Sequence, residues 1–186
     1  MVTLIFEHPH KSYTTEHSYS MNQAFTLIEL IAVIVITAII SAVALPSLGM
    51  ITNARSAGAA QTLAAHLEYA RELALNTGLH AWVVLDVNND TAATFANAEG
   101  TTTFAQATPA TDPRSGFPMT LSLNTGDYIG VTITSAVIAG GTTVGFDWLG
   151  TPIDTAEKPL LADGVITLSG GPKVSIHAVT GTIRIR

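Results

Sequence analysis

The sequence has no cysteine, which excludes structural disulfides and thiolate metal sites. Charge is also scarce: charged residues make up 12% of the 186 residues, against 47% hydrophobic ones. This balance is typical of a chain with a membrane segment rather than of an ordinary soluble protein. The formal net charge of −6 argues against nucleic acid as the main partner.

The scarcity of charge is extreme in one stretch, because Glu29 is the only ionisable side chain between Phe25 and Asn53. As a helix, the apolar run 25–45 would be about 31 Å long, the thickness of a bilayer core. The run is too long for a signal-peptide apolar region, and no A-x-A-like cleavage site follows it. We therefore predict a transmembrane N-terminal helix over residues 25–48 and set aside a buried core helix.

Glu29 needs an explanation, because a carboxylate in hydrocarbon costs about 2.5–3.5 kcal/mol. No Lys or Arg lies one helical turn away. Cleavage before Phe25 would create a cationic α-amine, and the amine of a neighbouring, axially shifted copy would reach the carboxylate. Glu29 is then an assembly device. The alternative is that it only reaches the headgroup region.

The stretch Ala24-Phe25-Thr26-Leu27-Ile28-Glu29 resembles the type III signal of type IV pilins and pseudopilins. The resemblance implies that a prepilin peptidase cleaves between Ala24 and Phe25 and methylates the new N-terminal Phe25. It places the family's glutamate on Glu29 and its helix-kinking proline on Pro46, both with roles in assembly. The family usually has glycine at the position of Ala24.

Residues 1–24 are then a leader peptide that is removed. Such leaders are typically short and basic, whereas this one sets Lys11 against Glu7 and Glu16. A start at Met21 would shorten the leader to Met21–Ala24. Both starts, Met1 and Met21, remain open.

Beyond Pro46, which should kink the helix without necessarily ending it, we predict an amphipathic continuation over residues 49–78. Its apolar stripe consists of Leu63, Leu67, Ala70 and Ala74, extended by Tyr69 and Leu73. Glu68 and Arg71 are expected to pair on the solvent side. Gly78 is expected in the C-cap region.

Residues 79–186 are predicted to form a β-rich periplasmic head. Strands are expected over 79–86, 91–95, 119–123, 128–138, 142–148, 165–168, 174–177 and 182–186, with an exposed loop over 105–118. Trp82, Phe95, Phe146 and Trp148 are expected to be core or loop anchors. The fold class is therefore α+β: a long N-terminal helix, transmembrane in one half and amphipathic in the other, packed on a C-terminal antiparallel β-sheet head of pilin-like type.

Three further segments narrow the resemblance to the GspH/FimT family of minor pseudopilins. They are Tyr69-Ala70-Arg71-Glu72-Leu73-Ala74-Leu75, Phe146-Asp147-Trp148-Leu149-Gly150-Thr151-Pro152 and Thr180-Gly181-Thr182-Ile183. Together with the N-terminal motif they favour a minor subunit over a major pilin.

Other candidate sites have weaker signals. The segment 86–90 has the spacing of the first three ligands of a calcium loop, but Thr91 and Asn97 occupy positions that need glycine and glutamate, so a polar hairpin turn is preferred. The histidines His66, His80 and His177 lack metal-site spacing, and no G-x-S-x-G elbow is present. We expect no metal, no cofactor and no enzymatic activity.

Lys173, Arg184 and Arg186 cluster in the last two predicted strands. Some proteins resembling FimT bind DNA through a basic C-terminal region, so these residues are candidates for a weak DNA contact. The chain after Ala24 nevertheless carries seven basic and twelve acidic residues, a net charge of −5. A solvated strand face is therefore preferred, and nucleic acid is not expected as a partner.

The resemblance implies a structural minor pseudopilin of a type II secretion system, built into a periplasmic pseudopilus after cleavage and N-methylation. Its partners would be other pilins or pseudopilins, the prepilin peptidase/methyltransferase, an inner-membrane assembly platform and the lipid bilayer. It would cross the bacterial inner membrane once, with its head in the periplasm. The alternatives are a type IV pilus minor pilin in priming or DNA uptake, and a membrane-tethered periplasmic binding module.

Overall fold

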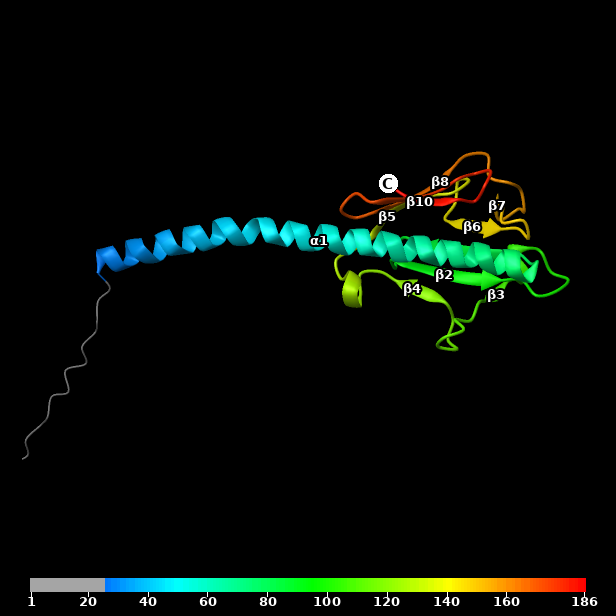
Figure 1. Cartoon of the computed structure of the whole chain (residues 1–186), viewed down its shortest axis with the longest axis horizontal. Helices are drawn as coiled ribbons and strands as arrows, with labels where there is room; N and C mark the ends of the chain where they lie inside the picture. The colour runs from blue at the N-terminus through cyan, green and yellow to red at the C-terminus, as the bar shows by residue number, and fades with distance from the viewer. Residues whose placement is uncertain (1–25) are drawn as a thin grey trace, which may run out of the picture. The chain divides into compact units, whose positions relative to one another are not determined.

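The computed structural model describes residues 26–186, except for the side chains of residues 43–50. The chain divides into two compact units, residues 1–42 and 43–186. One helix, α1 (Leu27–Thr77), contributes to both units and is followed by a head of ten short strands within the described chain (Figure 1). The expected long helix and C-terminal β head are thus confirmed, and α1 continues through Pro46 as predicted.

The ends of α1 have local causes. Thr26 precedes the first turn, and its hydroxyl oxygen accepts a hydrogen bond from the backbone N–H of Glu29 at 3.3 Å, as an N-cap does. At the other end, the N–H of Gly78 donates to Ala74 O at 2.9 Å, and Gly78 has a φ of 70°. This left-handed conformation is the one for which a helix-ending glycine is favoured, so the predicted C-cap is confirmed.

The head contains antiparallel β-sheet, as predicted, and it is divided into two sheets, which the sequence analysis did not specify. The first has the order β3-β2-β1-β6-β7, with β4 also paired to β2. Its strands are β1 (Ala81–Asp86), β2 (Thr91–Ala96), β3 (Thr108–Pro109), β4 (Thr120–Ser122), β6 (Thr143–Phe146) and β7 (Pro152–Ile153). The second has the order β10-β9-β8-β5, from β5 (Ile133–Val137), β8 (Gly164–Leu168), β9 (Lys173–Ile176) and β10 (Ile183–Ile185).

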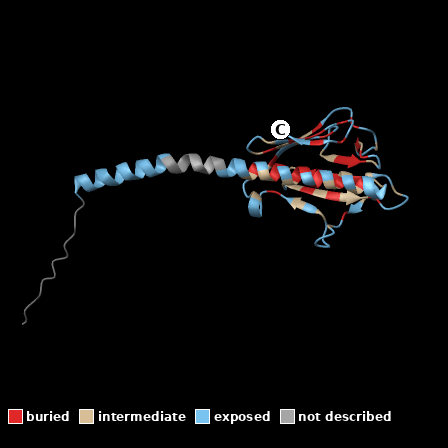
Figure 2. Cartoon of the chain, in the orientation of Figure 1, coloured by how far each residue is buried: buried red, intermediate tan, exposed pale blue. Residues whose placement is uncertain are grey.

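The apolar stripe of α1 covers both sheets. Leu63, Leu67, Ala70 and Ala74 are all fully buried, as predicted. They form one core cluster with Val83 and Phe146 of the first sheet and with Ile166, Val174 and Ile176 of the second. Figure 2 shows the alternation of buried and exposed positions along this part of α1. A helix that covers two sheets explains why so small a head retains a continuous core.

Several predicted strand bounds are wrong. Residues 128–132 are not strand: Tyr128 ends a short 3-10 helix, Gly126–Tyr128, and β5 begins only at Ile133. The start of β5 is fixed by Asp90 Oδ1, which accepts a hydrogen bond from Ile133 N at 2.8 Å. A side chain 43 positions away sets this boundary, and hydropathy patterns do not report such contacts.

The predicted loop 105–118 is also more ordered than expected. It includes the end of a 3-10 helix, Phe104–Gln106, and the short strand β3, which pairs with the end of β2. The strand β7 was not predicted at all, because two residues show no periodicity. The remaining strands lie within two residues of their predicted bounds.

Candidate assembly interface

The described N-terminal part of α1, residues 27–42, is exposed on every side. Its side chains are mainly Leu, Ile, Val and Ala, with exposed fractions of 76% at Leu27 and 62% at Ile39. So much exposed apolar surface on one helix requires a cover of lipid or of neighbouring helices. By the joint criteria of length and hydropathy, no helix within the described residues qualifies as a membrane span.

The polar residues of this segment use their hydroxyl groups within the helix. Thr37 Oγ1 donates to Val33 O, and Ser41 Oγ donates to Thr37 O at 2.7 Å. Each hydroxyl therefore bonds the carbonyl four residues earlier, a known way to satisfy a helical Ser or Thr without an outside partner. Thr37 and Ser41 thus do not interrupt the apolar surface.

Glu29 differs from Thr37 and Ser41 in how its side chain is satisfied. It lies exposed in the first turn of α1, where its negative charge is favourable near the positive end of the helix dipole. Its backbone N–H is bonded to Thr26, but within the described residues its carboxylate accepts no hydrogen bond. The spacing Thr26-x-x-Glu29 is that of a capping box, a signal in the sequence that our reading of this segment missed.

The other predicted N-terminal sites, or their side chains, lie outside the part of the chain that the structure describes. The cleavage residues Ala24 and Phe25, the methylation site at Phe25 and the leader 1–24 lie outside the described residues. Pro46 lies within α1, but its side chain is outside the described part, so the predicted kink stays a prediction.

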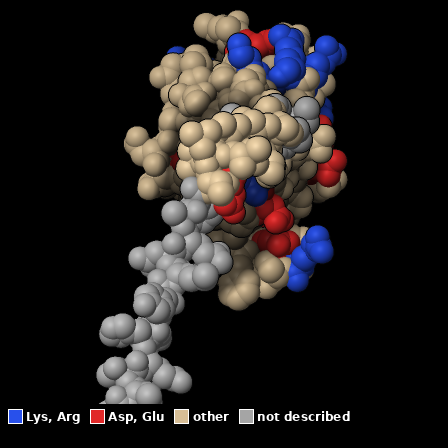
Figure 3. Space-filling model, turned by 90° about the vertical axis from the view of Figure 1, so that its left-hand side faces the viewer, with Lys and Arg blue, Asp and Glu red and all other residues tan. Residues whose placement is uncertain are grey.

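The structure brings the three predicted basic residues together on the second sheet. Arg184 and Arg186 alternate with inward-facing Ile183 along β10, and Lys173 at the start of β9 lies opposite Arg186, with reciprocal backbone hydrogen bonds of 2.8 Å. All three side chains are exposed. Figure 3 shows Lys and Arg side chains gathered at one edge of the head. We call Lys173, Arg184 and Arg186 the basic face.

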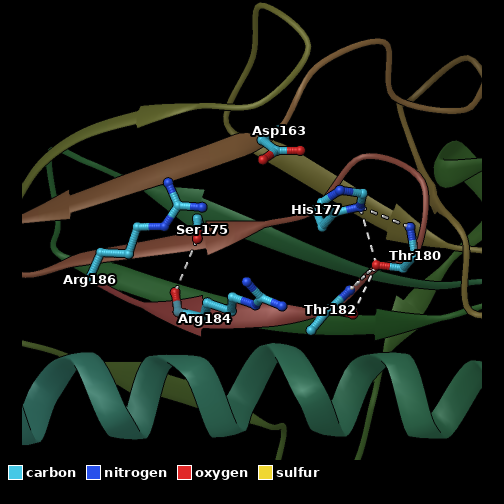
Figure 4. A pocket seen from close by; sticks show the side chains of 7 residues that line it. All are labelled: Asp163, Ser175, His177, Thr180, Thr182, Arg184 and Arg186. Atoms are coloured by element: carbon cyan, nitrogen blue, oxygen red, sulfur yellow. Dashed lines mark hydrogen bonds between the residues drawn. The ribbon is translucent and has the colours of Figure 1, made fainter.

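A shallow pocket of about 230 Å³ adjoins the basic face. Its lining includes both arginines together with His177, Thr182 and the carboxylate of Asp163 (Figure 4). Asp163 Oδ1 accepts a hydrogen bond from Ala178 N at 2.9 Å, so this acid holds the turn after β9. The pocket is polar and open, and no catalytic pair or triad is assembled among these side chains.

Six aspartates of the head cap turns by accepting backbone N–H groups. They are Asp86, Asp90, Asp112, Asp147, Asp154 and Asp163. Such caps are a standard use of Asp in loops. Much of the negative charge of the chain is therefore explained by loop structure, and the net charge does not report on the local field at the basic face.

The segment 86–90 is confirmed as a hairpin turn between β1 and β2. Asp86 accepts hydrogen bonds from the side chain and backbone of Asn89 and from the backbone of Asn88, and these lower its pKa. Asp90 instead bonds Ile133. The two carboxylates thus serve different partners, and no group of metal-ligating side chains occurs among the described residues.

The three histidines lie apart. His66 on α1 is buried, and its Nε2 lies 2.8 Å from Thr94 Oγ1 on β2. Burial lowers the pKa of His66 from 6.5 to about 4, so the ring is neutral near pH 7. His80 bonds Thr102 O, and His177 bonds Thr180 within the turn after β9. Each has a structural partner.

The prediction that Arg71 pairs with Glu68 on the solvent side is wrong. Arg71 is half-buried, and its Nε donates to Gly150 O at 3.2 Å. A Cβ on Gly181 would overlap with that same carbonyl oxygen and would approach Arg71. Arg71 thus joins the three segments that resemble the GspH/FimT family: the end of α1, the turn after β6 and the turn after β9.

The predicted aromatic anchors divide into two groups. Trp82 and Phe146 are fully buried, and Trp82 Nε1 donates to Asn97 Oδ1 at 2.6 Å. Phe95 is half-buried and meets the ring of Phe104 edge to face. Trp148 is 57% exposed on the turn after β6, so it is a loop residue and not part of the core.

A comparison with protein families matches residues 19–45 to the prokaryotic N-terminal methylation motif. The match spans the predicted cleavage site, Glu29 and the apolar run. This motif implies a membrane-anchored chain with a head exposed to the periplasm. No curated protein matches the sequence.

Among solved structures, the chain is similar to the minor pseudopilin EpsH of the type 2 secretion system of Vibrio cholerae. Two structures of that protein match with TM-scores of 0.51 and 0.52, at 11% and 13% identity, and cover 70% and 72% of this chain and 94% of EpsH. The type IV minor pilin FimU of Pseudomonas aeruginosa matches with a TM-score of 0.43 at 17% identity, over 70% of this chain and 87% of FimU. The fold of the chain is thus pilin-like, and pilins and pseudopilins are structural proteins rather than enzymes.

Proposed function

We propose that this chain is a structural minor pseudopilin of a type II secretion system. One observation carries the proposal: a single chain joins the N-terminal methylation motif to a head with the fold of EpsH. The chain would be anchored once in the bacterial inner membrane by residues 25–48 and cleaved before Phe25. After N-methylation it would join a periplasmic pseudopilus through an inner-membrane assembly platform.

The exposed apolar surface of residues 27–42 supplies the physical basis of assembly. Lipid would cover this surface before assembly, and the equivalent helices of neighbouring subunits would cover it in the filament. Glu29 would then pair with the α-amine of a neighbour's Phe25, because an unpaired carboxylate is costly at this depth. Among the described residues its carboxylate accepts no hydrogen bond, which agrees with a partner from outside.

Mass spectrometry of the N-terminus and an incorporation assay test the proposal together. We expect the cellular form to begin with N-methylated Phe25, and Glu29→Gln to abolish entry into filaments. Glu99→Gln, at an exposed position in the head, is the matched control and should leave incorporation unchanged. An intact leader, with neither the wild type nor Glu29→Gln entering filaments, would instead support a membrane-tethered periplasmic binding module.

A second candidate is a type IV pilus minor pilin that acts in pilus priming or DNA uptake. The observation that favours it is the gathering of Lys173, Arg184 and Arg186 on one exposed face. Three phosphate contacts would give a salt-dependent affinity. A gel shift with the full-length protein at 50 and 200 mM salt, repeated with R184E/R186E, distinguishes this role. A shift that weakens with salt and disappears in the variant would support it.

A further inference from the structure

The half of α1 that packs on the head keeps one face open to solvent. Exposed positions recur at Gln61, Ala65, Glu68, Glu72 and Leu75, with the alternating spacing of four and three that marks a single helical face. This face lies opposite the buried stripe of Leu63, Leu67, Ala70 and Ala74. It is a continuous strip that no other part of the described head covers.

Two uncompensated acids lie in the middle of this strip. Glu68 and Glu72 are four residues apart, so their carboxylates repel each other on an isolated helix. The nearby Arg71 does not neutralise them, because its guanidinium is directed to Gly150 O. Within the described residues neither glutamate makes a hydrogen bond or an ion pair. We call Glu68 and Glu72 the acidic strip.

The basic face is opposite in charge to the acidic strip, and its two arginines have nearly the same spacing as the two glutamates. Arg184 and Arg186 project from the same side of β10, about 6.8 Å apart along the strand. Glu68 and Glu72 are about 6 Å apart along the helix axis. The guanidinium groups, like the two carboxylates, form no ion pair in the described part of the chain. Two cations and two anions with nearly equal spacing are thus left exposed on different surfaces of one head.

We propose that the basic face of one copy docks on the acidic strip of a second copy, with Arg184 beside Glu72 and Arg186 beside Glu68. The inference rests on the proposed role as a filament subunit and adds a contact between heads. Because the two surfaces differ, the contact is heterologous.

The positions of the two surfaces along α1 require an axial shift between copies. Gly181 lies beside Arg71, and β10 then leads away from Gly181 to Arg184 and Arg186. At about 3.3 Å per residue, Arg184 lies on the order of 10 Å along β10 from Gly181, so the basic face and the acidic strip of one head are offset from each other.

Disulfide cross-linking tests this contact in the full-length protein. The chain has no cysteine, so each engineered thiol is unique. One tagged copy carries L75C beside the acidic strip, and a second, differently tagged copy carries T182C beside the basic face. In membranes that contain both, we expect mixed L75C–T182C dimers in clear excess over L75C–L75C dimers.

Charge reversal then identifies the paired residues. R184E/R186E on the T182C copy should lower the mixed dimer about tenfold or more, because like charges would meet across the contact. Adding E68K/E72K to the L75C copy should restore the mixed dimer. R114E/K158E on the T182C copy makes the same change in net charge at exposed positions elsewhere and should have no effect.

Three results would overturn the inference: no mixed dimer, a mixed dimer unaffected by R184E/R186E, or no rescue by the reversed partner. If Glu29→Gln still blocks incorporation, the proposed function stands without this contact. If the N-terminus is uncleaved and Glu29→Gln incorporates normally, the proposed function itself fails. A DNA shift that R184E/R186E abolishes, without a mixed dimer, assigns the face to nucleic acid and also overturns the inference.

Discussion

The two halves of α1 share one backbone conformation but differ in what covers their apolar side chains. In the half on the head, Leu63 and Leu67 are fully buried by the two sheets of the same chain. In the N-terminal half, Leu30 is 59% exposed and Ile39 62% exposed. One half therefore completes its packing within the molecule, whereas the other needs lipid or other subunits.

The polar groups of the two halves differ in the same way. The buried ring of His66 has its partner, Thr94, within the head. The carboxylate of Glu29 has none among the described residues. A polar group that is satisfied within the chain stabilises the fold, whereas Glu29 is left for a partner from outside, as we propose.

The largest expected effect comes from removing a leucine in each half. Leu67→Ala should lower the free energy of unfolding of the head by about 2–5 kcal/mol, because it leaves a cavity between α1 and the sheets. Leu30→Ala should leave that free energy unchanged. Urea unfolding of the full-length protein in detergent, followed by near-ultraviolet circular dichroism, measures both. Equal losses of unfolding free energy in the two variants would contradict the distinction between the two halves.

Acid should lower the free energy of unfolding of the head, because His66 binds a proton more readily in the unfolded chain. In the folded head the pKa of His66 is about 4, against 6.5 in the unfolded chain, so the unfolded chain binds more protons between these values. Stability is therefore complete above pH 6.5 and falls as the pH drops toward 4, by up to about 3 kcal/mol. Unfolding measured from pH 7.5 to 4 checks the slope. His66→Gln should remove most of this slope, and His177→Gln should not.

Glycine-to-alanine substitutions test the contact of Arg71 with the turns after β6 and β9. Gly181→Ala places a methyl group against Gly150 O, whereas Gly116→Ala meets nothing within 4 Å at a similar positive φ. Both variants incur about 1–2 kcal/mol of left-handed strain. Only Gly181→Ala should add about 1–3 kcal/mol from overpacking. Thermal unfolding of the two variants side by side measures the difference, and equal losses would contradict the close contact.

The smallest expected effect concerns the start of α1. Thr26→Ala removes the hydroxyl that accepts the Glu29 N–H and should destabilise the first turn by about 1 kcal/mol. Hydrogen exchange at residues 27–29 in detergent should become faster, while exchange in the head stays unchanged. Thr37→Ala is the control, because its hydroxyl bonds a carbonyl within the helix and caps no N–H. Faster exchange in both variants would argue against a specific cap.

Much of the fold was predictable because it follows local rules. The apolar run, the stripe at Leu63 and Leu67 and the glycine at the end of α1 repeat at helical spacing or occupy a defined cap position. The hairpin of β1 and β2 was predictable from two alternating runs around a polar turn. The assembly role of Glu29 stays a prediction, and it rests on a charge that conflicts with its apolar surroundings.

What was missed depends on contacts between distant residues. The division into two sheets follows from pairing across long separations, such as β5 with β8. The half-buried Arg71 was predicted on the solvent side, because its partner, Gly150, lies on a turn 79 positions away.

The sequence by itself determined the long helix, its apolar first half, the position of Glu29 within it and the β-rich character of the head. Each of these follows from hydropathy and periodicity within one continuous segment. Only the tertiary structure decided that α1 covers two sheets, that Lys173 meets Arg186 across strands and that Glu68 and Glu72 remain exposed, with no cation paired to them among the described residues. Those features depend on strand register and chain reversal, which bring together residues that no local pattern connects.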